Sequence, residues 1–243
     1  MKKHNATIQT LVLALCLGLL LNCGQSPLDL DDTLDPNGTD DNELAGNTSV
    51  STACAGLDLV DVTEDINDNT TWKGDTVYVI RAWNFYVNAT LVIEPGAIIK
   101  FHATDGPEMV LGGAGTILAQ GTEASPIIFT SYKDDTHGCD NNGDGTDSLP
   151  AAKDWGSVDT NGLNGSIFDH CEFYYGGDTA YSATLALSAG SIATVINSTF
   201  AHNDGGDESG WYGAFDASHA EAGTVIQNNV FYDNVRPLSI SVA

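Results

Sequence analysis

Three related hexapeptides decide the fold: "FDHCEF" at Phe168–Phe173, "VINSTF" at Val195–Phe200 and "IQNNVF" at Ile226–Phe231. Each has an apolar residue first, His or Asn third, Cys, Ser or Asn fourth, and phenylalanine last. The closing phenylalanines are 27 and 31 residues apart. A hexapeptide that recurs at this period indicates stacked coils of parallel strands. A β-sandwich also has short strands, but they recur every ~8–12 residues and would not repeat one hexapeptide at this spacing.

Stacked coils place equivalent side chains directly above one another, about 4.8 Å apart. We therefore predict an internal phenylalanine ladder and a polar ladder at the turn, where stacked amides can hydrogen-bond one another. The polar ladder would contain His170, Asn197 and Asn228. The predicted interior residues are Phe168, Cys171, Phe173, Val195, Ser198, Phe200, Ile226 and Phe231.

The first half of the chain carries strand-length apolar runs without a helical period, such as "TVYVI" and "PIIFTS". Phe101 and Phe129 each close such a run and are 28 residues apart, which suggests that they are also stacked counterparts. The succession of "LVIEPGAIIKF", "GTILAQGTEASPIIFTS", "DNNGDG" and "DWG" resembles the right-handed parallel β-helix of many exported bacterial lipoproteins. Cys139, Lys153 and Ser157 stand where that pattern usually has glycine.

We predict an all-β protein, a right-handed parallel β-helix of roughly six coils, over residues 57–243. Because members of the resembled family largely lack an assigned activity, the resemblance implies a fold and a surface location more than a chemistry.

The composition narrows the range of partners. The chain has 33 acidic and 8 basic residues and a formal charge of -25. Nucleic acid, anionic membrane surfaces and soluble polyanions are disfavoured, because like charges repel. Cations and neutral or basic surfaces remain possible partners.

The N-terminus indicates export. Two lysines precede an apolar run, Leu11–Leu21, which has the length of a secretory signal core. The run ends in "LLNC", which resembles a lipobox, so we predict a signal peptide at 1–22 and lipidation of Cys23. Asn22 departs from the small residue usual before that cysteine, and an ordinary signal peptide or an uncleaved anchor is the alternative. The expected location is the bacterial cell envelope, at the outer membrane or cell surface.

Residues 23–56 are rich in Asp, Asn, Gly, Thr and Ser and lack Lys, Arg and aromatic residues. Such a segment buries too little apolar surface to offset its ordering entropy. We predict a disordered acidic tether, with a binding tail as the alternative. After export and lipidation, Cys54, Cys139 and Cys171 remain; three cysteines allow at most one disulfide within the chain, and the pairing stays open.

The segment Asp134–Asp147 is strongly acidic. Within it, Asp140, Asn142 and Asp144, followed by Gly145, match the first half of a calcium loop. The glutamate of a full EF-hand is replaced by Ala151. We predict a weak structural calcium site with ligands Asp140, Asn142 and Asp144; the alternative is an acidic insertion rigidified by Asx turns.

A polysaccharide lyase or hydrolase is the alternative function. A hydrolase needs two facing carboxylates, and Asp178, Asp204 and Asp207 are the candidates. The aromatic residues that could form a carbohydrate-stacking face are Trp72, Trp83, Trp155, Trp211, Tyr174, Tyr175 and Tyr212.

The sequence therefore predicts a lipid-anchored binding or structural module with a polysaccharide or protein ligand. The residues after Phe231 contain another strand but no capping helix. Solenoids need capped ends, so we expect either a longer repeat protein or end-to-end association at this coil.

Overall fold

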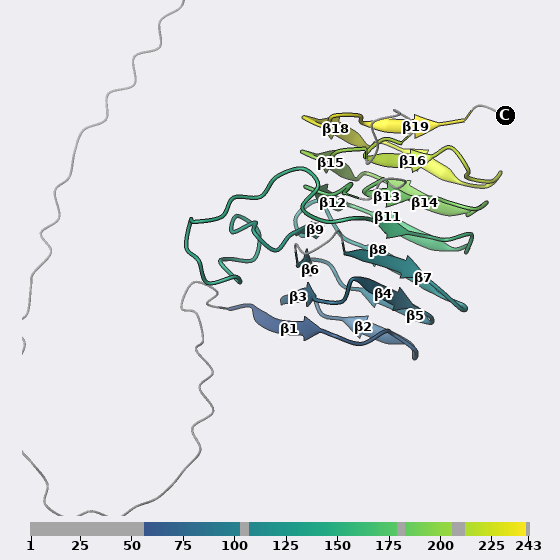
Figure 1. Cartoon of the computed structure of the whole chain (residues 1–243). Coiled ribbons are helices and arrows are strands. Elements are labelled where there is room, and N and C mark those ends of the chain that lie inside the picture. Colours follow the sequence, from purple (N-terminus) through teal and green to yellow (C-terminus); the bar gives the residue numbers. More distant parts are fainter. Residues whose placement is uncertain (1–55, 103–106, 179–182, 206–211, 242–243) are drawn as a thin grey trace, which may run out of the picture. The chain divides into compact units, whose positions relative to one another are not determined.

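The computed structural model describes residues 56–102, 107–178, 183–205 and 212–241. These residues form nineteen strands and no helix, and so none of them belongs to a helix that could cross a membrane. The strands form three sheets in which every pairing is parallel. The predicted fold class is confirmed: the chain is a parallel β-helix (Figure 1).

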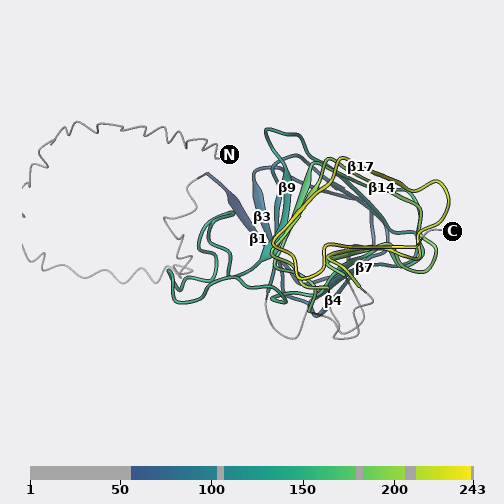
Figure 2. The ribbon, with the colours of Figure 1, turned by 90° about the horizontal axis from the view of Figure 1, so that it is seen from above.

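The chain visits the three sheets in turn. Sheet A contains β1 (Asp58–Val62), β3 (Thr76–Ile80), β6 (Ile98–Phe101), β9 (Ile127–Ser131), β12 (Cys171–Tyr174), β15 (Thr199–Ala201) and β18 (Val230–Tyr232). Sheet B contains β4 (Asn84–Val87), β7 (Glu108–Leu111), β10 (Val158–Asp159), β13 (Leu185–Ala186), β16 (Phe215–Ala217) and β19 (Leu238–Ile240). Sheet C contains β2 (Thr70–Trp72), β5 (Thr90–Ile93), β8 (Thr116–Gln120), β11 (Ser166–Asp169), β14 (Ala193–Ile196) and β17 (Val225–Gln227). Seen along the stack, the coils superimpose into a ring, and a long loop leaves it beside sheet A (Figure 2).

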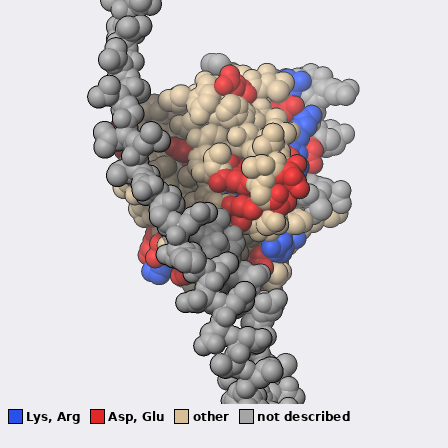
Figure 3. Space-filling model, turned by 90° about the vertical axis from the view of Figure 1, so that its left-hand side faces the viewer, with Lys and Arg blue, Asp and Glu red and all other residues tan. Residues whose placement is uncertain are grey.

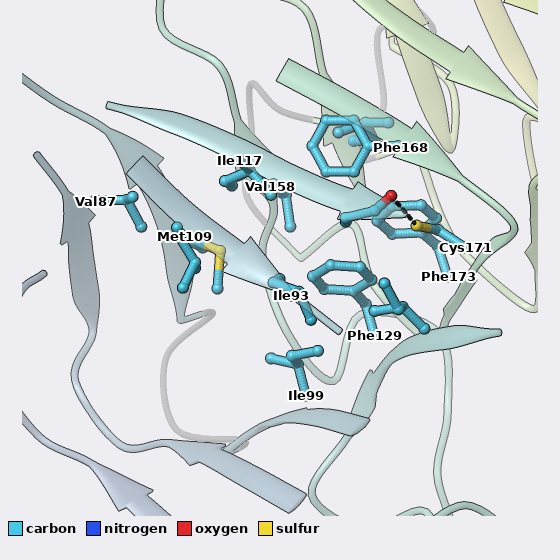
Figure 4. Close-up of a cluster of buried hydrophobic side chains, with 14 of the residues drawn as sticks. Val87, Ile93, Ile99, Met109, Ile117, Phe129, Val158, Phe168, Cys171 and Phe173 are labelled. Atoms are coloured by element: carbon cyan, nitrogen blue, oxygen red, sulfur yellow. Dashed lines mark hydrogen bonds between the residues drawn. The ribbon is translucent and has the colours of Figure 1, made fainter. Parts of the chain in front are cut away.

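The phenylalanine ladder forms as predicted. Ring centroids are 4.7 Å apart for Phe129 and Phe173, 4.8 Å for Phe173 and Phe200, and 5.1 Å for Phe200 and Phe231. Parallel pairing in register places these rings face to face inside sheet A. Figure 4 shows the interior around Phe129, Phe173, Phe168 and Cys171. Of the predicted interior residues, all are buried except Ile226 and Phe231, which are partly buried against the core.

Phe101 does not belong to this ladder, so the predicted pairing of Phe101 with Phe129 is wrong. The register places Ile99 opposite Phe129 and Phe101 opposite Ser131. The two phenylalanines are 28 residues apart, whereas register partners between these strands are 30 apart, as for Ile98 and Ile128. Phe101 is still inside, where its ring stacks on Trp155 at 4.1 Å.

The polar ladder at the turn from sheet C to sheet A forms in part. Asn228 Nδ2 donates to Asn197 Oδ1 at 3.2 Å, and Asn197 Nδ2 donates to Asp169 Oδ1 at 2.9 Å. His170 is therefore not the next member of the hydrogen-bonded chain, although it occupies the equivalent turn position. All three predicted positions have a left-handed backbone, with φ of 49°, 52° and 56° at His170, Asn197 and Asn228.

The last coil exposes apolar side chains. Leu238 is 39% exposed and Ile240 51%, although their register partners Phe215 and Ala217 in the preceding coil are buried. Parallel strands elsewhere in the described residues are covered by the next coil, and this one is not. End-to-end association through this coil stays a prediction.

Candidate functional site

The long loop between β9 and β10, residues 132–154, lies on the outer face of sheet A. That face carries a second apolar cluster of Val77, Val79 and Ile98, against which Tyr132 packs. Gly138 sits so close that a Cβ on it would lie 2.9 Å from Val77 Cγ2, and its φ is +71°. Only glycine accommodates both the contact and this backbone conformation. The loop is therefore packed onto the sheet.

A buried lysine holds the base of the loop. Lys100 extends from β6 and is fully buried, and its Nζ donates to the carbonyl oxygens of Asp134 at 2.8 Å and Cys139 at 2.7 Å. Burial lowers the pKa of Lys100 to about 8, an effect that the nearby carboxylates oppose. Two backbone carbonyls of the loop are thus bound by one strand side chain.

Asp134 organises the first turn of the loop. Its carboxylate accepts hydrogen bonds from Thr130 Oγ1 at 2.6 Å and Thr136 N at 3.1 Å, and it lies 2.7 Å from His137 Nδ1. Burial alone would raise the pKa of Asp134, but the hydrogen bonds from His137, Thr130 and Thr136 outweigh it and lower that pKa to about 2. Asp134 is therefore a structural anion that is already satisfied by protein donors.

The other end of the loop is fixed by Asp154. Its carboxylate accepts from Ser131 Oγ at 2.7 Å and Ala151 N at 3.0 Å, and it forms an ion pair with Lys133 Nζ at 2.7 Å. Because Ser131 and Lys133 lie where the loop begins and Asp154 ends it, these contacts close it at its neck.

The tip of the loop is an Asx-type turn. Asp140 accepts from Gly143 N at 2.6 Å and from Gly145 N at 2.9 Å. Asn142 is bonded to Asp144: Asn142 Nδ2 donates to Asp144 Oδ2 at 3.0 Å, and Asp144 N donates to Asn142 Oδ1 at 3.3 Å. Ser148 Oγ also donates to Asp144 Oδ2, at 2.6 Å.

The loop brings three carboxylates together. Ligand oxygens of Asp135, Asp140 and Asp144 all lie within 4.8 Å of one another. Asp140 and Asp144 are two of the three predicted ligands, and Asp135 lies with them. The third predicted ligand, Asn142, is hydrogen-bonded to Asp144. Asp135 was within reach of sequence reasoning because it lies in the same acidic run. Its inclusion, however, depends on the fold of the loop.

Two oxygens of this group have no partner. Asp135 Oδ1 and Asp144 Oδ1 are buried, and no hydrogen bond from the described residues reaches them. Burial, followed by repulsion from Asp140, raises the pKa of Asp135. Buried acceptors of this kind are normally satisfied, and exceptions call for an explanation such as an ion.

Two of the residues that replace expected glycines have left-handed backbones, with φ of 68° at Cys139 and 72° at Lys153. Cys139 is disulfide-bonded, and Lys153 forms an ion pair with Asp204 at 3.3 Å. Cys171 is free and buried, which raises its thiol pKa. Cys23 and Cys54 lie outside the described residues.

Two of the three candidate catalytic carboxylates, Asp178 and Asp204, belong to turns between sheets A and B. Asp178 is exposed, and its backbone N donates to Trp155 O at 3.0 Å. Asp204 accepts from Gly205 N at 2.6 Å besides pairing with Lys153. Asp207 lies outside the described residues. These contacts give Asp204 partners typical of a turn residue.

Acidic side chains gather in several patches on the face that Figure 3 presents, and fewer basic ones accompany them.

No family model, no curated protein and no solved structure matches this chain.

Proposed function

We propose that the protein is a lipid-anchored β-helix of the bacterial cell envelope that acts as a binding or structural module, and that loop 132–154 carries a weak structural calcium site. The apolar segment Leu11–Leu21 and the "LLNC" motif support export and the lipid anchor. The packed loop supports the calcium site.

The observation that carries the calcium proposal is the convergence of Asp135, Asp140 and Asp144, with two of their buried oxygens unpartnered. Three carboxylates this close repel one another unless a cation neutralises them. Oxygen ligands and an exported location favour calcium.

The proposed site is structural because it sits in a loop whose base and neck are already fixed. Lys100, Asp134 and Asp154 hold the loop through protein contacts alone, so the ion would order only the tip. Three carboxylates at a half-buried tip suit the ~10⁻⁴–10⁻³ M affinity of extracellular calcium modules.

Calcium titration followed by thermal melts tests this. At a calcium concentration about ten times the dissociation constant, we expect a stabilisation of about 1–2 kcal/mol relative to EDTA. The double variant Asp135→Asn/Asp144→Asn should lose this stabilisation, because it removes two of the three charges. Asp147→Asn is the matched control: Asp147 lies in the same loop, is exposed and is outside the group.

A wild-type melting temperature that is the same in calcium and in EDTA would refute the site. An Asp147→Asn variant that loses the calcium effect equally would show a general response to loop charge instead.

The enzyme alternative takes second place because Asp204 is engaged by Lys153 and Gly205. Polysaccharide turnover that is abolished by Asp204→Asn would reverse this order.

A further inference from the structure

The outer face of sheet A is exposed at β18. Loop 132–154 lies over the lower strands and reaches β12, where His137 stacks on the buried Tyr174 at 4.9 Å, whereas Val230 and Tyr232 of β18 are exposed. A groove of about 400 Å³ opens there. Its lining includes Glu123, Glu172, Asn197, Thr199, Asn228 and Val230.

One wall of the groove is an unusually long turn. The segment between β8 and β9 spans residues 121–126, and Thr122 and Ser125 exchange backbone hydrogen bonds across it. In the three coils that follow, the same corner is one residue, His170, or two residues, Asn197–Ser198 and Asn228–Asn229, and its first residue has a left-handed backbone. The long turn of residues 121–126 therefore projects beside the shorter turns at His170, Asn197 and Asn228 and forms one side of the groove.

The floor of the groove is rich in neutral hydrogen-bonding groups. The amides of Asn197 and Asn228 are joined at 3.2 Å, and Thr199 adds a hydroxyl beside them. Glu172 is held by Tyr174 OH, which donates to Glu172 Oε2 at 2.9 Å. Lysine and arginine are absent from the groove's lining among the described residues.

An apolar platform adjoins this floor. On β18, Val230 is 53% exposed and Tyr232 is 43% exposed, and both point outward from the strand. The Tyr232 ring meets the His202 ring edge-on at 5.6 Å, and His202 in turn stacks on Tyr175 at 5.6 Å. These contacts hold Tyr232 in place while it remains accessible.

We propose that this face, defined by Glu172, Asn197, Thr199, Asn228 and Tyr232, binds a neutral oligosaccharide. The inference rests on the proposed function as a binding module and names its ligand class. The apolar face of a sugar ring would pack on Tyr232, and its hydroxyls would exchange hydrogen bonds with the amides and with Glu172. Tyrosine supplies a large contact area together with a polar tip.

The charges and donors of the face select the ligand. A polyanion is opposed by Glu123, Glu172 and the formal charge of -25. A basic peptide would use the carboxylates but would leave the amide N–H donors of Asn197 and Asn228 facing a cation. A polyol both donates and accepts, so it satisfies amides and carboxylates together.

The test uses the full chain, purified in detergent, with cellohexaose, xylohexaose, mannohexaose and chitohexaose as probes. Hexagalacturonate and hexalysine are the comparators. Saturation-transfer NMR should detect at least one neutral hexasaccharide, and calorimetry should give it a dissociation constant below ~1 mM. Tyr232→Ala should weaken that binding about tenfold or more, as truncation of a central tyrosine does at other binding sites.

Two further variants make the result specific. Glu172→Ala should also weaken binding, which tests the floor independently of the platform. Tyr86→Ala removes a tyrosine of similar exposure, 38%, from β4 of sheet B and should bind as the wild type does. Thermal melts confirm that each variant is folded.

Three outcomes overturn the inference: no neutral hexasaccharide binds, hexalysine alone binds, or binding survives both Tyr232→Ala and Glu172→Ala. Calcium melts on the same samples separate this failure from that of the proposed calcium site. If no sugar binds but calcium still stabilises the protein, only the oligosaccharide site is refuted. If a sugar binds but calcium does not stabilise the protein, only the calcium site is refuted.

Discussion

At the scale of single residues, the turn positions His170, Asn197 and Asn228 could be located from the sequence, but their physical role could be predicted only in part. The repeat indicated stacked amides, and the amides of Asn197 and Asn228 do hydrogen-bond. The shared left-handed backbone was not predicted. Asparagine tolerates this conformation better than most residues, which provides a second reason for its recurrence.

Substitutions at Asn197 separate these two reasons. Asn197→Gly should lose about 1 kcal/mol of unfolding free energy, because the side-chain hydrogen bonds to Asp169 and Asn228 disappear. Asn197→Ala should lose about 1–2 kcal/mol more of unfolding free energy, because the left-handed backbone is also sterically unfavourable for alanine. Urea denaturation measures both. Equal losses in the two variants would show that the hydrogen bonds alone matter.

At the scale of elements, strands β3 and β6 contained a signal that sequence reasoning did not use. All residues of both strands are buried, including the outward-facing Val77 and Lys100. Continuous apolar runs are typical of strands covered on both faces, so "TVYVI" and "IIKF" could have predicted a covering segment. The identity of that segment could not be predicted, because Lys100 reaches a loop that begins more than thirty residues later.

Lys100 gives this loop a pH dependence. Its pKa is about 8 in the folded protein and ~10.4 in an unfolded chain. Between these values the unfolded state binds more protons, so the free energy of unfolding should rise with pH, by roughly 1–3 kcal/mol from pH 8 to 10.5. Lys100→Met should lack this rise and, near pH 7, should be less stable because two loop carbonyls lose their donor.

Chemical denaturation in EDTA across this pH range measures the effect. Lys73→Met is the control, since Lys73 is exposed and the variant retains Lys100. A wild-type curve that runs parallel to that of Lys100→Met would contradict the prediction.

At the scale of the whole molecule, the repeat predicted the stack, its parallel strands and roughly the number of coils, because each of these follows from one period. It did not predict how the outer face is used. The loop and the long turn of residues 121–126 are insertions, and insertions carry no period. The acidic cluster shows the same limit, since the abundance of acidic residues in the sequence hid that Asp135 converges with Asp140 and Asp144.

Two features bear on the location of the protein: the disulfide at Cys139 and the lipobox-like motif that ends at Cys23. Cys139 is disulfide-bonded, and disulfides persist mainly in oxidising compartments outside the cytosol, which supports export. We therefore predict that, in a bacterial host, the chain is cut before Cys23 and carries a diacylglyceryl group on that residue. Intact-mass measurement of the membrane fraction should show the loss of residues 1–22 and the added lipid. Cys23→Ser should abolish both changes, whereas Cys16→Ser, which alters only the segment removed, should leave the mature mass unchanged. A lipid-free mature chain that begins at any other residue would contradict the anchor and leave an ordinary signal peptide as the explanation of the N-terminus.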